Sequence, residues 1–97
     1  MPTYIGLIRY TQQGVSKVKD SPSRVEAFKK AAAAKGGKVK AVYWTLGQYD
    51  GVIIVEMPGD AEAATLMLEM GKQGNVSTET LRAFTEEEFG KIAGNVG

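Results

Sequence analysis

The chain has no cysteine and no histidine among its 97 residues. Without a thiol or an imidazole there is no cysteine nucleophile, no serine–histidine dyad, no imidazole general base and no disulfide. The usual ligand sets of transition metals and haem are missing as well, so we expect no metal site and no cofactor. The residue types that remain leave open whether the protein is an enzyme.

The chain also lacks an excess of charge of either sign. The chain has 12 Lys and Arg residues against 11 Asp and Glu residues, for a net charge of +1. A nearly neutral protein is a poor partner for duplex nucleic acid or for an anionic membrane surface, and we expect neither. One small basic region is predicted to be solvated surface because it lacks interleaved arginines and aromatics: Lys29, Lys30, Lys35, Lys38 and Lys40.

Long apolar runs are absent too. No stretch approaches the roughly 18 apolar residues that span a bilayer, and the first residues do not form a charged leader followed by an apolar run. We therefore expect a cytoplasmic protein. The 43% of hydrophobic and 24% of charged residues are typical of a globular protein, and the length fits a single domain over residues 1–97.

Local patterns predict four strands and three main helices. Ser21 followed by Pro22 is typical of a helix start, and Gly36-Gly37 is typical of a helix stop. A capping-box pattern, Thr and then Glu three residues later, precedes the last helix. We predict strands over residues 2–10, 38–46, 52–57 and 76–84, helices over 22–35, 61–72 and 86–93, and a helical turn over 15–18.

This order, β-α-β-β-α-β with a terminal helix, is the α+β arrangement of ferredoxin-like folds. The four-stranded sheet is expected to be antiparallel and to carry both long helices on one face, because right-handed crossovers place them together. In the second strand, alternation assigns Val42, Trp44 and Leu46 to one face and Val39, Ala41 and Tyr43 to the other.

The strands are apolar on both faces, whereas one layer of helices covers a single face. The third strand is apolar throughout residues 52–55, and the first strand places Ile5 and Leu7 opposite Tyr4 and Ile8. Such strands are typical of sheets that are buried on both sides. We therefore predict a homodimer in which a second copy packs its sheet face to face against the first.

Three segments of the chain resemble the GYD-domain family of small bacterial and archaeal proteins. One of them ends in Gly47-Gln48-Tyr49-Asp50, which is the Gly-Tyr-Asp signature of the family with one residue inserted. The likeness extends over nearly the whole chain, and the segments together are far more specific than the short signature alone. They cover residues 43–50, 74–76 and 80–89.

The resemblance implies a dimeric α/β barrel, in agreement with the sheet packing predicted above. It implies no reaction, since the biochemical role of the family is largely uncharacterised. Relatives in the wider group include cofactor-free monooxygenases, haem degraders, stress-response proteins and aromatic-acid cyclases. Because the chain has no histidine, haem degradation is not expected.

Asp50 and Tyr49 are the candidate catalytic residues. At the mouth of a cleft, Asp50 would act as a general base and Tyr49 as a phenolic donor. The alternative interpretation is structural: Asp50 bonds its own turn through its side chain, while Gly47 and Gly51 adopt unusual backbone angles. Turns select these residue types on physical grounds, so we favour the structural interpretation.

A cleft between the sheet and the helices is the expected ligand site, with Tyr4, Trp44, Tyr49 and Arg82 as its predicted ligand-binding residues. Aromatic side chains line many ligand pockets, but they also fill cores and interfaces. A closed, mixed polar and aromatic cavity of at least ~300 Å³ would favour ligand binding. A space filled by Trp44 and Met67 would favour a purely structural role.

Pro2 offers a different chemistry. Removal of Met1 would leave a secondary amine at the head of a strand, as in the oxalocrotonate tautomerases, and a free α-amine titrates near neutrality. An ordinary proline at the start of a strand is the simpler interpretation.

These patterns together predict a homo-oligomer that binds a small, partly apolar molecule between sheet and helices. A purely structural oligomer without a ligand site is one alternative. The other is a cofactor-independent enzyme of the monooxygenase or tautomerase kind.

Overall fold

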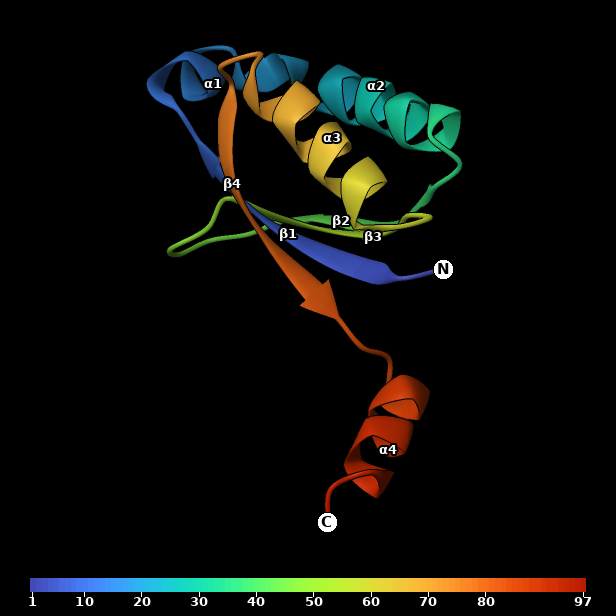
Figure 1. The fold of residues 1–97 in the computed structure, drawn as a ribbon. Helices are drawn as coiled ribbons and strands as arrows, with labels where there is room; N and C mark the ends of the chain where they lie inside the picture. The colour runs from blue at the N-terminus through green and yellow to red at the C-terminus, as the bar shows by residue number, and fades with distance from the viewer.

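A four-stranded antiparallel sheet organises the chain in the computed structural model, which describes residues 1–97 (Figure 1). The strands lie in the order β2-β3-β1-β4. This is the ferredoxin-like arrangement, and the predicted α+β fold class is confirmed. The strands are β1 (Thr3–Tyr10), β2 (Lys38–Trp44), β3 (Gly51–Glu56) and β4 (Val76–Ala83); the helices are α1 (Gln12–Ser16), the 3-10 helix η1 (Val18–Asp20), α2 (Ser21–Ala34), α3 (Asp60–Gly71) and α4 (Glu86–Gly94).

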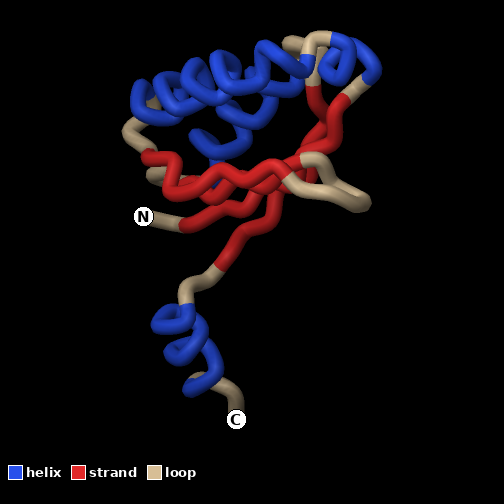
Figure 2. The backbone as a smooth tube through the Cα atoms, turned by 180° about the vertical axis from the view of Figure 1, so that it is seen from behind, coloured by secondary structure: helices blue, strands red, loops and turns tan.

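The two long helices, α2 and α3, form one layer over one face of the sheet (Figures 1 and 2). The core lies between the two layers. Val55, Met57 and Leu66 are its largest fully buried side chains, and Tyr4 and Phe28 close it from β1 and α2. The other face of the sheet has no layer of this chain against it, and only 13 of the 97 residues are buried.

Helix α4 projects away from the rest of the molecule, beyond the end of β4 (Figure 1). The radius of gyration is 14.5 Å, whereas a compact chain of this length has about 12.5 Å. The capping box predicted at Thr85 is present: Thr85 Oγ1 accepts from the Glu88 backbone N–H, and the Glu88 carboxylate accepts from the Thr85 backbone N–H. The helix starts where its local sequence dictates, although nothing in the chain packs firmly beside it.

The face assignment of β2 was wrong for Val39. The register of β2 against β3 shifts between Val39 and Ala41, so Lys40 is an extra residue in the strand. A bulge of this kind reverses the alternation of side chains. Val39 therefore packs against the core together with Val42, instead of lying on the opposite face with Tyr43.

Most element boundaries lie within one residue of the prediction, and three of the differences bear on the site. Strand β2 ends at Trp44, so Leu46 belongs to no face of the sheet and is fully exposed in the loop. The helical turn expected over residues 15–18 is α1, which begins earlier because Thr11 caps it by accepting from the Gly14 backbone N–H. Helix α2 includes Ser21 as its first residue, so Asp20 and not Ser21 occupies the N-cap position. The Ser21 side chain can therefore bond a group outside the helix. No helix is both long and apolar enough to cross a membrane.

Candidate functional site

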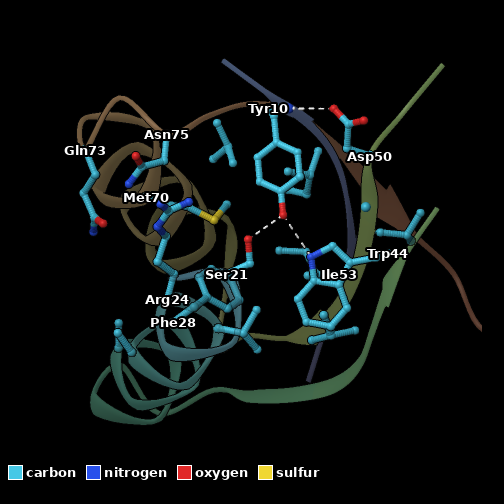
Figure 3. Close-up of a pocket in the computed structure, with 18 of the residues that line it drawn as sticks. Tyr10, Ser21, Arg24, Phe28, Trp44, Asp50, Ile53, Met70, Gln73 and Asn75 are labelled. Atoms are coloured by element: carbon cyan, nitrogen blue, oxygen red, sulfur yellow. Dashed lines mark hydrogen bonds between the residues drawn. The ribbon is translucent and has the colours of Figure 1, made fainter. Parts of the chain in front are cut away.

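A pocket of about 150 Å³ lies between the sheet and helices α2 and α3 (Figure 3). Of its 21 lining residues 14 are hydrophobic, so most of its wall favours an apolar molecule. Phe28 comes from α2, Met70 from α3, and Val42 and Ile53 from neighbouring strands. The pocket is partly open to solvent, which gives a small molecule a route into it.

Three polar side chains meet on the wall of this pocket. The hydroxyl groups of Tyr10 and Ser21 share a hydrogen bond of 2.6 Å, and the indole Nε1–H of Trp44 donates to the Tyr10 hydroxyl over 3.1 Å (Figure 3). The trio joins the end of β1, the start of α2 and the end of β2. Ser21 is buried, whereas Trp44 is half-exposed.

Arg24 places a cation on the same wall. Its Nη2 donates to the backbone carbonyl of Lys17 over 2.8 Å, which anchors the guanidinium. Its Nη1 is buried and has no hydrogen-bond acceptor. Figure 3 shows the side chain running from α2 toward Met70 and Asn75.

Asp50 also lines the pocket, but its carboxylate is engaged. Oδ2 accepts from the Tyr10 backbone N–H over 2.8 Å, so the side chain bonds the adjacent strand and not its own turn (Figure 3). Gly47 has a positive φ of 109°, as the structural interpretation requires. Gly51 does not; a Cβ there would lie 3.2 Å from the carbonyl oxygen of Tyr43, so glycine permits close approach of β2 and β3.

Tyr49 is not among the residues that line the pocket. Its hydroxyl donates to Glu79 over 3.0 Å, and the Arg9 guanidinium lies 4.6 Å from the centre of its ring. Arg9 also pairs with Glu79 at 3.2 Å. The hydrogen bond to Glu79, followed by desolvation, raises the pKa of Tyr49 above its ordinary value. Strand alternation puts Arg9 and Glu79 on the face of the sheet away from the helices.

Tyr4 and Arg82 form a second group outside the pocket wall. The buried Tyr4 hydroxyl donates to Asp60 at the start of α3. That hydrogen bond, followed by burial, raises the pKa of Tyr4. The guanidinium of Arg82 lies near two aromatic rings, 5.7 Å from the centre of Tyr4 and 4.6 Å from that of Phe84.

The structure thus brings together two of the predicted site residues, Trp44 and Asp50, and places Tyr4, Tyr49 and Arg82 elsewhere. The sequence analysis did not single out Ser21 or Arg24 as site residues. Ser21, Arg24 and Phe28 are separated by three and four residues, which is the spacing of one helix face. This spacing could have indicated that Ser21 and Arg24 lie on the same side of the helix as Phe28.

One curated relative matches most of the chain. It is the "Glutamine synthetase and cystathionine beta-lyase binding protein" of Thermus thermophilus, which is 37% identical over 84 residues, covering 86% of this chain and 88% of the relative. A solved structure from the same species, that of the protein TTHA0845, has a TM-score of 0.56 and 30% identity, covering 88% of this chain and 95% of that one.

Other solved structures share the fold at lower identity. A feast or famine regulatory protein from M. tuberculosis, complexed with L-methionine, has a TM-score of 0.67 and 18% identity and is matched over 88% of this chain. The chain spans about half of that protein, 51% of its length. At this identity the likeness establishes the ferredoxin-like fold alone. The GYD domain family model, in contrast, matches residues 4–93, and the chain therefore belongs to the GYD domain family.

Proposed function

We propose that this protein is a homodimer that binds a small, partly apolar molecule in the pocket between its sheet and its helices. The observation that carries the proposal is the composition of the pocket wall, which is mostly apolar but includes the hydroxyl groups of Tyr10 and Ser21 and the indole N–H of Trp44. Ligand sites typically combine such an apolar wall with a few convergent polar groups.

The volume of the pocket limits the size of the ligand. The pocket measures about 150 Å³ and is partly open, so it falls short of the closed cavity of at least ~300 Å³ stated above as favouring ligand binding, and only a smaller molecule fits. An apolar cavity of roughly 150 Å³ accommodates benzene. Trp44 is 53% exposed and leaves the space open, and Met67 belongs to the core cluster beside it. We therefore propose a ligand built around about one six-membered ring or an aliphatic group of that size.

The uncovered face of the sheet supports the dimer. Strand alternation puts Ile5, Ile54 and Leu81 on this face, and Leu81 is 48% exposed. Helix α4 exposes Phe89 and Ile92 as well. Exposed apolar side chains on an uncovered sheet face are typical of a protein–protein interface, and a second copy offers the same surface in return.

Phenol tests the pocket, because it has one ring and one hydroxyl. Ala31 on α2 lines the pocket and Ala33 on the same helix is exposed. We expect phenol to shift the indole N–H resonance of Trp44, the only tryptophan, in the wild type and in Ala33→Leu. Ala31→Leu fills the space, so the same titration should leave that resonance in place. An equal response of both variants would overturn the pocket as the binding site.

A second candidate function is binding to an enzyme. It is favoured by the relative from Thermus thermophilus, whose name describes a protein that binds glutamine synthetase and cystathionine beta-lyase. Mixing the purified chain with glutamine synthetase and with cystathionine beta-lyase from its own organism tests it by sedimentation velocity. A joint boundary with either enzyme supports this function, and separate boundaries at micromolar concentrations of both partners contradict it.

A further inference from the structure

We propose that the pocket selects a small monocarboxylate, whose carboxylate group is held by Arg24 and whose apolar body fills the rest of the space. This inference rests on the proposed function, because it names the chemical class of ligand for the same pocket. It starts from the buried Nη1 of Arg24, a donor with no acceptor in the chain.

A buried, unpaired guanidinium nitrogen is costly. A charged donor that gives up its hydrogen bonds to water without gaining an acceptor is destabilised by the full cost of its desolvation. The neighbouring carboxylate of Asp20 is a weak partner, since its oxygen lies 4.0 Å from Nη2 and its side chain is 65% exposed. Side-chain exposure of Arg24 itself is 22%. The guanidinium is therefore largely removed from water while its charge is poorly compensated.

Arg24 is also held in place before any ligand arrives. The hydrogen bond from Nη2 to the carbonyl oxygen of Lys17 anchors one end of the guanidinium, while Nη1 has no acceptor and is closed to solvent. A ligand carboxylate therefore reaches Nη1 when the side chains beside it move aside. Guanidinium groups bind carboxylates through short, charge-assisted hydrogen bonds. A ligand carboxylate would supply both the acceptor and the negative charge that this position lacks.

The two acidic residues on the pocket wall do not compete for Arg24. Asp50 accepts from the Tyr10 backbone N–H, and Glu69 forms an ion pair of 2.6 Å with Lys35. Arg24 is the only basic residue among the lining residues. Arg24 is thus the one point of the wall where an anionic group would find a cation.

The remaining wall determines the rest of the ligand. Phe28, Ile53 and Met70 line the pocket along with Arg24, and they offer apolar contacts. A ring or branched alkyl group of about six carbon atoms fits the volume, and one carboxylate is as much charge as the wall can balance. We therefore expect aromatic or branched-chain monocarboxylates to bind and dicarboxylates of similar size to be rejected.

Benzoate and benzamide test this inference, because they have the same shape and differ in charge. Both are titrated into the full-length protein at one salt concentration and followed through the Trp44 indole N–H resonance. For the wild type we expect benzoate to bind about tenfold more tightly than benzamide, as a charge-assisted hydrogen bond implies. Arg24→Gln should remove this preference, and Arg24→Lys should keep part of it. Lys30→Gln, which removes an exposed charge from the same helix, should keep all of it.

Each other outcome has a distinct meaning. Equal binding of benzoate and benzamide to the wild type would overturn the carboxylate inference and leave the proposed pocket intact. A benzoate preference that survives in Arg24→Gln would also overturn it, because another cation would then be responsible. Failure of phenol, benzoate and benzamide alike would overturn the proposed function itself. A circular dichroism spectrum of each variant verifies that its fold is retained.

Discussion

The hydroxyl oxygens of Tyr10 and Ser21 lie 2.6 Å apart, so the last residue of β1 is tied directly to the first residue of α2. These residues are only 11 positions apart, and α1 and η1 fill the connection between them. The contact therefore fixes the start of α2 above the end of the sheet. Because Trp44 donates to the same Tyr10 hydroxyl, one side-chain oxygen organises one wall of the pocket.

Removal of this oxygen is expected to destabilise the protein. Tyr10→Phe leaves the Ser21 hydroxyl buried without its partner, and we expect a loss of about 1–2 kcal/mol in the free energy of unfolding. Urea denaturation at a fixed protomer concentration measures it. Ser21→Ala and the double variant complete a cycle. A coupling energy below about 0.3 kcal/mol would contradict a direct interaction between the two groups.

The uncovered sheet face gives a prediction about assembly. Leu81→Lys puts a charge on this face, and we expect it to weaken self-association at least about 100-fold, since burying an unpaired ammonium is costly. Sedimentation velocity at micromolar concentration should show a dimer for the wild type and a monomer for the variant. Leu68→Lys is the matched control, because Leu68 is 73% exposed on α3. A monomeric wild type would refute the proposed dimer.

The raised pKa of Tyr4 predicts a loss of stability at alkaline pH. The folded state keeps the Tyr4 proton above the ordinary pKa of 10.0, at which the unfolded chain releases it, because the hydroxyl donates to Asp60 and is buried. The contribution is present below pH 10.0 and is lost as the pH rises through the folded-state pKa. Ultraviolet titration of tyrosinate should show two of the four tyrosines, Tyr4 and Tyr49, ionising late.

Asp60→Asn provides the control for this titration. The variant removes the negative charge and the strongest acceptor from the Tyr4 hydroxyl, so one of the two late tyrosines should ionise closer to pH 10.0 while Tyr49, which donates to Glu79, stays late. If the curves of the variant and the wild type coincide, Asp60 is not the cause of the shift.

The capping box of α4 gives a prediction at acidic pH. Its hydrogen bond from the Thr85 backbone N–H lowers the pKa of Glu88 below its ordinary value of 4.5. Stabilisation by the ionised carboxylate is present above pH 4.5 and is lost as the pH falls through the lowered pKa. We expect the Cα chemical shifts of residues 86–89 to move toward random-coil values over that range.

Glu88→Gln separates this effect from the other acidic residues of the same turn. Glutamine keeps an acceptor for the Thr85 N–H but does not titrate, while Glu86 and Glu87 still do. The pH-dependent fraying of α4 should therefore be smaller in this variant. Identical fraying in both proteins would show that Glu88 is not responsible.

Sequence patterns predicted the elements of this fold because the forces that start and stop them are local. The capping box at Thr85, the helix stop at Gly36 with its positive φ of 82°, and the alternation along β1 act over a few residues. The order of the elements then led to the ferredoxin-like sheet through general rules of chain connection. The bulge at Lys40 reverses the alternation of side chains in β2, and the local sequence pattern did not predict it.

The pocket, in contrast, depends on contacts between distant segments. Tyr49 was predicted as a site residue from its place in the turn before β3. Its hydroxyl instead donates to Glu79, 30 positions away, and neither residue lines the pocket. Nothing local indicated that Trp44 would bond Tyr10 or that Arg24 would keep one nitrogen unpaired. Sequence alone determined which residues form strands and helices, since backbone hydrogen bonding and side-chain periodicity are short-ranged. Only the tertiary structure decided which polar groups meet, because that depends on how the sheet and helices pack, and packing sums many small contacts over the whole chain.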